Sequence, residues 1–255
     1  MSYRKDRIGV LARQVVPAHL SQDEFAQNVH AVVNACSDLP EFQNNILELD
    51  IVFPNDRNAA SVQQSGLPGL QNVVLLLFQC RSKENFIQLL SDSRVQATFA
   101  KAETDFQFLS TLTLCSADIF DRIPLANQPV EDTPRAGGLA LFRFESDAAA
   151  QVYVNRVTEF GQFFRLPSVV RLVRGYATWV GNEAMAQDLR ELGFKTLDHA
   201  VVSIVESESF DVFTEITREV SSTTMVSSAL ENVKLADGSF SSSATIVSKK
   251  KREGN

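Results

Sequence analysis

The chain repeats its own pattern at an offset of about 127 residues, and this internal repeat constrains the fold more than any other feature. Leu39-Pro40 falls on Leu166-Pro167, and Phe86 falls on Phe213. The offset grows to about 131 residues at the start of the copies, which predicts a shorter first helix in the second copy. Matched prolines and matched apolar positions in the same order indicate an internal duplication.

The first copy contains four predicted strands and two predicted helices. Apolar residues alternate or run together over strands at 7–15, 46–53, 73–80 and 112–117. The first helix begins at a capping box, in which the Ser21 hydroxyl accepts from a first-turn amide and Glu24 reaches back to the Ser21 N–H. Apolar side chains at helical spacing continue to Cys36, and Pro40 ends the helix. A second helix is predicted from Lys83 to about Ala100.

A segment rich in proline, glycine and acidic residues, 127–138, disfavours regular structure and is predicted to be a linker. The second copy then has predicted strands at 139–145, 169–180, 200–206 and 240–247. Its main helices are predicted at 148–164 and from 210 to about 230, with a short helix within 182–192. The order of elements is therefore the same in both copies.

Each copy has the order β-α-β-β-α-β of a ferredoxin-like unit, a four-stranded antiparallel sheet with both helices on one face. The other sheet face needs cover, and Val73–Phe78 has no polar side. We therefore predict an α+β fold in which two ferredoxin-like halves, 1–126 and 139–248, pack their sheets into one intramolecular barrel. This internal pseudo-dimer favours a monomer, with a homodimer as the alternative, and residues 249–255 are expected to form a basic tail.

Composition excludes several classes of function. A formal net charge of −7 disfavours a nucleic-acid partner, and no apolar run is long enough to cross a membrane. Cys36, Cys80 and Cys115 are widely spaced in apolar sequence, so they are interpreted as reduced core thiols of a cytoplasmic protein. No phosphate-binding glycine loop or histidine cluster is present, so we expect neither a metal nor another cofactor.

Short motifs in the first copy resemble EthD-like proteins of the dimeric α+β barrel superfamily, in a tandem, fungal-type form. The helix opens with Leu20-Ser21-Gln22-Asp23-Glu24-Phe25, carries His30 and closes on Leu39-Pro40 before the second strand. The resemblance covers most of the chain in the order of elements. It departs from the family pattern in lacking an aromatic residue ahead of His30 and in having Val157 at the matching position of the second copy. It implies a pocket for an aromatic or polyketide-like compound, with any family-type site in the first half.

Three residues are candidates for catalysis. Histidine side chains in general titrate near neutral pH, so His30 is a candidate general acid or base. Glu48 and Asp50 share one strand face, and two like charges held close together form an acid–base pair when buried. The alternatives are a partly exposed helix histidine and a solvated strand face.

Five residues are candidates for substrate binding. They are cationic or aromatic side chains on predicted strands: Arg13, Arg143, Arg174, Tyr176 and Trp179. Arg174 and Tyr176 share a strand face and could bind a carboxylate or phenolate, with barrel-lining residues that neutralise each other as the alternative, whereas Trp179 is more consistent with core packing. The loop from Pro54 to Gln71 is long enough to be a lid.

These observations favour a cofactor-independent lyase or isomerase that acts on a hydrophobic small molecule of secondary metabolism. General acid–base catalysis in an apolar barrel pocket would support cyclisation, dehydration or decarboxylation. One alternative is a non-catalytic binding or stress-associated barrel. The other is an oxygenase, either cofactor-free or haem-dependent.

Overall fold

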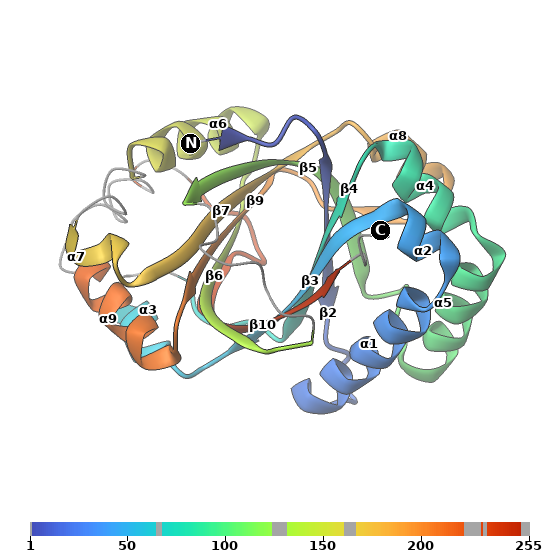
Figure 1. The fold of residues 1–255 in the computed structure, drawn as a ribbon, viewed down its shortest axis with the longest axis horizontal. Helices are drawn as coiled ribbons and strands as arrows, with labels where there is room; N and C mark the ends of the chain where they lie inside the picture. The colour runs from blue at the N-terminus through green and yellow to red at the C-terminus, as the bar shows by residue number, and fades with distance from the viewer. Residues whose placement is uncertain are drawn as a thin grey trace, which may run out of the picture.

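Eight antiparallel strands close into a single barrel in the computed structural model of the chain (Figure 1). The structure describes residues 2–64, 68–123, 132–160, 167–221, 231 and 234–250. The first half supplies β2 (Ile8–Val15), β3 (Ile46–Asn55), β4 (Val73–Cys80) and β5 (Leu112–Ile123). The second half supplies β6 (Arg135–Arg143), β7 (Val173–Asn182), β9 (Ala200–Ser207) and β10 (Phe240–Lys250).

Both halves have the strand order of a ferredoxin-like sheet. The strands lie as β5-β2-β4-β3 in the first half and as β10-β6-β9-β7 in the second, so the fourth strand neighbours the first in each. Antiparallel pairing of β3 with β10 and of β5 with β7 joins the two sheets on both sides. The predicted α+β fold with two repeated halves is confirmed, and the closed barrel removes the free sheet edges.

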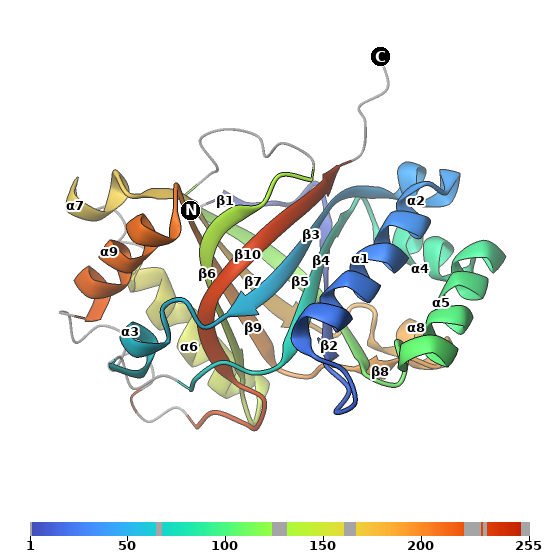
Figure 2. The same cartoon turned by 90° about the horizontal axis from the view of Figure 1, so that it is seen from below.

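Helices cover the outside of the barrel on two sides (Figures 1 and 2). The first sheet carries α1 (Gln22–Ser37), α2 (Pro40–Asn45), α4 (Lys83–Ser91) and α5 (Ser93–Phe106). The second carries α6 (Asp147–Phe160), α7 (Pro167–Val170) and α9 (Phe210–Ser221). Two short strands, β1 (Ser2–Tyr3) and β8 (Lys195–Thr196), pair with β5. Among the described residues no helix is long and apolar enough to cross a membrane.

The halves also exchange short helices. α3 (Ala59–Gln64) follows β3 but lies beside α9 of the second half, whereas α8 (Ala186–Glu191) follows β7 but lies with the helices of the first half (Figure 1). Asn58 accepts a hydrogen bond from Thr214 Oγ1 at 2.8 Å, and Arg57 lies 4.5 Å above the Phe210 ring. The described part of the loop expected to be a lid is therefore docked on the second half.

Buried side chains form three layers. One cluster fills the barrel, and its largest members are Trp179 and Phe240 together with leucines and isoleucines of both halves. The other two clusters lie between each sheet and its helices. Side chains fill the middle of the barrel, and this differs from the apolar barrel pocket that the sequence predicted.

Two helix boundaries differ from the prediction. The capping box of α1 is present as predicted, with Glu24 N donating to Ser21 Oγ and Ser21 N donating to Glu24 Oε2. The predicted helix 83–100 is split at Asp92, whose carboxylate accepts from the backbone N–H groups of Arg94 and Val95 and so caps α5. Pro40 ends α1 but also begins α2, because proline is well suited to the first helical position.

The boundaries predicted for the linker and the tail also need correction. β6 begins at Arg135, inside the segment 127–138, because its glycines serve close packing: a Cβ atom at Gly138 would lie 2.0 Å from Cζ of Phe213. β10 continues to Lys250, and Lys249 is buried and paired with Asp132. The remaining parts of these segments, 127–131 and 251–255, lie outside the described residues.

Candidate functional site

A polar cleft lies at one end of the barrel, where β4, β5 and β9 end and β3 and β7 begin. We call it the carboxylate cleft, because four acidic side chains border it: Glu48, Asp50, Asp121 and Glu206. Arg4 and Gln79 complete its polar wall, and Trp179, Ile119 and Ile204 form its apolar wall. The sequence placed Glu48, Asp50 and Trp179 among the candidates, and the structure brings these three together.

Arg135 joins two of the carboxylates. Its Nη2 donates to Asp50 Oδ1 at 2.9 Å and to Ser248 Oγ at 2.6 Å, and its Nη1 pairs with Glu206. The three charged side chains are only 11–15% exposed. Asp50, Arg135 and Glu206 come from β3, β6 and β9. Their contact therefore forms only when β10 pairs with both β3 and β6.

Glu206 is a cleft residue with a strongly shifted pKa. Burial raises the pKa of Glu206 to about 7. The Arg135 guanidinium acts in the opposite direction, and the charges of Asp50 and Glu48 reinforce the rise. Burial and the charges of Asp50 and Glu48 outweigh the effect of Arg135 on this pKa, so a proton is retained near neutral pH. A carboxyl group with such a pKa can both donate and accept a proton under ordinary conditions.

A second set of hydrogen bonds fixes the other wall of the cleft. Gln79 Oε1 accepts from Arg4 Nη1 at 2.7 Å and from Arg7 Nη1 at 3.1 Å, while Gln79 Nε2 donates to Glu48 Oε2 at 3.2 Å. Arg4 Nε donates to Asp121 Oδ2 at 2.5 Å. These bonds hold the polar side chains in defined positions, which preorganises the cleft.

Tyr176 and Arg174 do not form the binding pair that their spacing predicted. Both point away from the barrel interior. Tyr176 borders the cleft but is buried in the outer cluster beside Phe142 and Tyr153. The Arg174 side chain is 53% exposed and forms an ion pair with Glu208 at 3.1 Å. The face that they share is therefore the outer face of the sheet, not the barrel interior.

His30 lies outside the barrel on α1. Its ring stacks on Phe53 at a centroid distance of 6.4 Å, and its Nδ1 lies 3.3 Å from Asn34 Nδ2. α1 covers the outer face of the first sheet, whereas Glu48 and Asp50 point to the inside. The structure therefore does not bring His30 to these carboxylates.

Arg13 and Arg143 lie at the opposite end of the barrel from the carboxylate cleft. Arg13 is near the end of β2 and Arg143 ends β6, and both follow an inward-facing leucine by two residues. They are therefore directed inward, but they do not border the carboxylate cleft.

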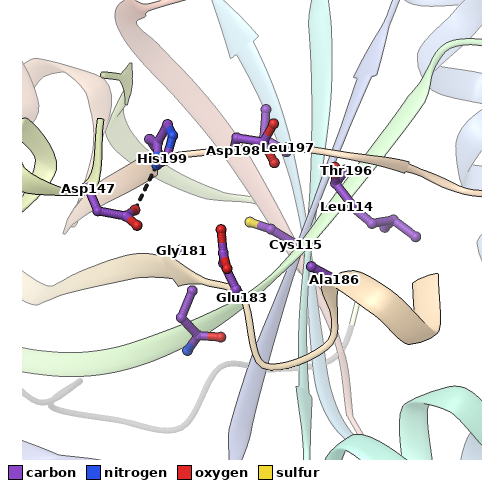
Figure 3. Close-up of a pocket in the computed structure, with 11 residues that line it drawn as sticks. Leu114, Cys115, Asp147, Gly181, Glu183, Ala186, Thr196, Leu197, Asp198 and His199 are labelled. Atoms are coloured by element: carbon purple, nitrogen blue, oxygen red, sulfur yellow. Dashed lines mark hydrogen bonds and ion pairs between the residues drawn. The ribbon is translucent and has the colours of Figure 1, made fainter. Parts of the chain in front are cut away.

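A second pocket, beside α8 and β9, contains His199 (Figure 3). His199 has a left-handed backbone with φ of 49°, and its Nδ1 lies 2.7 Å from Asp147 Oδ1. Glu183 and Asp198 also line the pocket, with Cys115 at its base. Burial raises the pKa of the Cys115 thiol to about 12, so a nucleophilic thiolate is disfavoured there.

A third hollow lies between the first sheet and its helices. It is lined by apolar side chains such as Phe42, Phe78 and Phe99. No titratable carboxylate, imidazole or amine borders it, so it can hold an apolar group but cannot transfer a proton to one. Across the part of the chain that the structure describes, no group of three or more His, Cys, Asp and Glu side chains is placed to bind a metal ion.

Arg135 and Glu206 were not among the residues selected from the sequence. Arg135 falls in the predicted linker, so no strand periodicity marked it. Glu206 carried a usable signal: it lies two and four residues after Ile204 and Val202, which face the barrel interior. A single glutamate on the inward face of an apolar strand is costly unless it has a partner or a function.

Comparison with known proteins supports the fold. No protein-family model matches the chain, and no curated protein matches it. Two similar solved structures are proteins provisionally assigned as monooxygenases. The one from Lactobacillus acidophilus NCFM has a TM-score of 0.50 and 9% identity, over 96% of this chain and 94% of the other. The one from Fusobacterium nucleatum subsp. nucleatum ATCC 25586 has a TM-score of 0.52 and 9% identity, over 96% and 93%.

Chlorite dismutase from Candidatus Nitrospira defluvii, solved in complex with imidazole, has a TM-score of 0.45 and 11% identity, over 94% of this chain and 92% of the other. Identities this low show the fold alone. The chain thus has the architecture of tandem dimeric α+β barrel proteins, with two ferredoxin-like halves in one polypeptide.

Proposed function

We propose that the chain is an EthD-like, cofactor-independent lyase or isomerase that works by general acid–base catalysis in the carboxylate cleft. The supporting observation is Glu206: a buried carboxyl group with a pKa of about 7, in hydrogen-bonding contact with Arg135 and beside the apolar wall formed by Trp179. Perturbed carboxyl groups in a cleft are typical of catalytic acids and bases.

The proposed chemistry is proton transfer next to a carbonyl group. Glu206, when ionised, takes a proton from the carbon beside a substrate carbonyl, and the electron pair of that C–H bond forms the enolate. Arg135 and Arg4 place positive charge where the enolate develops. Glu206 then returns the proton to another carbon in an isomerisation, or to a leaving hydroxyl group in a dehydration.

The substrate class follows from the shape of the barrel. Because the interior is filled, the reacting carbonyl enters only the end of the barrel while the rest of the molecule remains outside. The Trp179 indole offers an apolar surface for a flat ring. We therefore propose a compact aromatic or polyketide-like carbonyl compound as the substrate. We also propose that the chain acts in the cytoplasm, where the buried free thiols Cys36, Cys80 and Cys115 remain reduced, and as a monomer or a homodimer.

Deuterium exchange into a cyclic 1,3-diketone, followed by NMR in D2O, tests this proposal without knowledge of the natural substrate. Wild-type protein should accelerate exchange, and Glu206→Gln should reduce the acceleration roughly 10²–10⁴-fold. Glu208→Gln is the matched control, because Glu208 is 71% exposed and two residues away. Exchange above buffer that is equal in all three proteins would remove Glu206 from the mechanism, whereas no exchange above buffer for a panel of such diketones would favour a non-catalytic binding barrel.

An oxygenase is the second candidate, because the fold resembles two proteins provisionally assigned as monooxygenases. Oxygen uptake in the presence of a hydroquinone separates this reaction from proton transfer. The visible absorption spectrum of purified protein, before and after addition of haemin, separates haem-dependent from cofactor-free oxygenation.

A further inference from the structure

Two arginines meet at the barrel end opposite the carboxylate cleft. A Cβ atom at Gly238 would lie 3.3 Å from Arg13 Nη2 and 3.6 Å from Arg143 Cδ, so both side chains reach the same point beside the turn that leads into β10. Gly238 itself has a φ of 88°, which suits glycine. The first strand of each half thus delivers one guanidinium to a shared position.

The hydrogen bonds of these arginines are incomplete. Arg13 Nη2 donates weakly to Gln71 Oε1 at 3.4 Å, and Arg143 Nη1 donates to the Asp237 backbone oxygen at 2.9 Å. The Nε atoms of both arginines are buried and have no hydrogen-bond partner in the described structure.

Neither arginine forms an ion pair with a carboxylate of the described residues, in contrast to Arg4 and Arg135 in the carboxylate cleft. Burial lowers the pKa of Arg13, and the positive charge of Arg143 lowers it further. Two guanidinium cations side by side, each with a buried Nε that has no hydrogen-bond partner among the described residues, are unfavourable unless an anion accompanies them.

We propose that Arg13 and Arg143 form a second binding site, for the carboxylate or phosphate group of a small organic anion. Guanidinium groups suit both because their N–H donors match paired oxygens. Phe240, Leu141 and Leu11 fill the barrel behind the site, so the ligand binds from the outer end. The site is independent of the carboxylate cleft: Arg13 is four residues, or about 13 Å, along β2 from Gly9, which Trp179 covers.

Calorimetric titration with benzoate, phenyl phosphate and inorganic phosphate tests the site. Wild-type protein should bind at least one of these probes saturably at a 1:1 ratio. Arg13→Gln and Arg143→Gln should each weaken binding roughly 10- to 100-fold, as expected for loss of a charge-assisted hydrogen bond. The ranking of benzoate against phenyl phosphate identifies the preferred charged group, and inorganic phosphate shows whether the organic part is needed.

Arg174→Gln is the matched control, because Arg174 is exposed and already paired with Glu208; it should bind as wild type does. Arg13→Lys keeps the positive charge but loses the planar guanidinium, so it should weaken probe binding by less than Arg13→Gln does. This conservative variant keeps the test valid if a glutamine variant fails to fold. Glu206→Gln should bind the probes normally, which separates this site from the proposed catalytic one. Absence of saturable binding to wild type, or an equal loss in Arg174→Gln, would refute the proposal.

Discussion

The Ser116 hydroxyl lies 2.6 Å from Asn182 Oδ1, across the boundary between the two halves of the barrel. The same contact recurs 127 residues later, where Ser243 Oγ lies 2.5 Å from Asn55 Oδ1. Each serine also accepts from a backbone N–H just beyond the asparagine, that of Met185 in one case and that of Asn58 in the other. The two seams that close the barrel are therefore held by the same duplicated polar contact.

Replacing either serine by alanine should destabilise the protein by about 1–2 kcal/mol, because each hydroxyl is fully buried and its partners would lose a hydrogen bond. The two effects should add, since the seams share no residues. Urea unfolding of Ser116→Ala, Ser243→Ala and the double variant measures this. Ser203→Ala is the control: its hydroxyl oxygen is buried without a partner, so its removal should be neutral or stabilising.

The duplicated fold was predictable because its signals are local and repeated. Neighbouring residues encode the capping box at Ser21 and the apolar run Val73–Phe78, and such local patterns recur at the 127-residue offset. The structure has the capping box and the apolar strand as predicted. The contact between Arg135 and Asp50 was not predictable in this way. It depends on β10 lying between β3 and β6, and nothing in any one strand encodes which strand of the other half it will meet.

Strand faces explain the remaining differences at the site. Alternation correctly places Glu48 with Asp50, and Arg174 with Tyr176, on common faces. Alternation does not indicate which face of a strand points into the barrel when both faces are apolar, as they are in this barrel. Glu48 and Asp50 face inward, whereas Arg174 and Tyr176 face outward. A bulge in the pairing of β7 with β9 between Val173 and Gly175 adds a local irregularity at this point.

The raised pKa of Glu206 makes stability depend on pH in a defined direction. Below about pH 4.5 the carboxyl group is protonated in both the folded and the unfolded chain. Between about 4.5 and 7 the unfolded chain releases the proton while the folded chain keeps it, so the folded state loses stability as pH rises. Above about 7 the loss is constant, on the order of 3 kcal/mol.

Glu206→Gln should remove this pH dependence. Its stability relative to wild type should therefore rise between about pH 4.5 and 7 and then level off, as measured by urea unfolding at a series of pH values. Glu208→Gln should show a flat difference over the same range. A difference that moves in favour of wild type as pH rises would mean that Arg135 holds Glu206 ionised, and would contradict the assignment of Glu206 as a neutral-pH acid–base group.

Gly9 permits the packing of the only tryptophan in the chain. A Cβ atom at position 9 would lie 2.7 Å from Cζ3 of Trp179, so Gly9→Ala should displace the indole and destabilise the fold by about 1–3 kcal/mol. Tryptophan fluorescence should change in the folded state, because it reports on Trp179 alone. Gly69→Ala is the matched control, since a Cβ atom there meets nothing within 4 Å. Unchanged fluorescence and stability in Gly9→Ala would show that Trp179 does not rest on this glycine.

The His30→Ala variant tests whether catalysis takes place at the end of the barrel or in the outer layer of helices. Because His30 lies on α1, with the sheet between it and the carboxylate cleft, its removal should leave diketone exchange unchanged. The partly exposed imidazole contributes a stack on Phe53 and one hydrogen bond to Asn34, so unfolding free energy should change by no more than about 0.5 kcal/mol. Glu206→Gln, measured beside it, should lose exchange while remaining folded. If His30→Ala instead lost roughly 10²–10⁴-fold of the exchange rate without a change in stability, catalysis would lie on the outer face of the first half, as the EthD-like resemblance implies, and the cleft carboxylates would be structural.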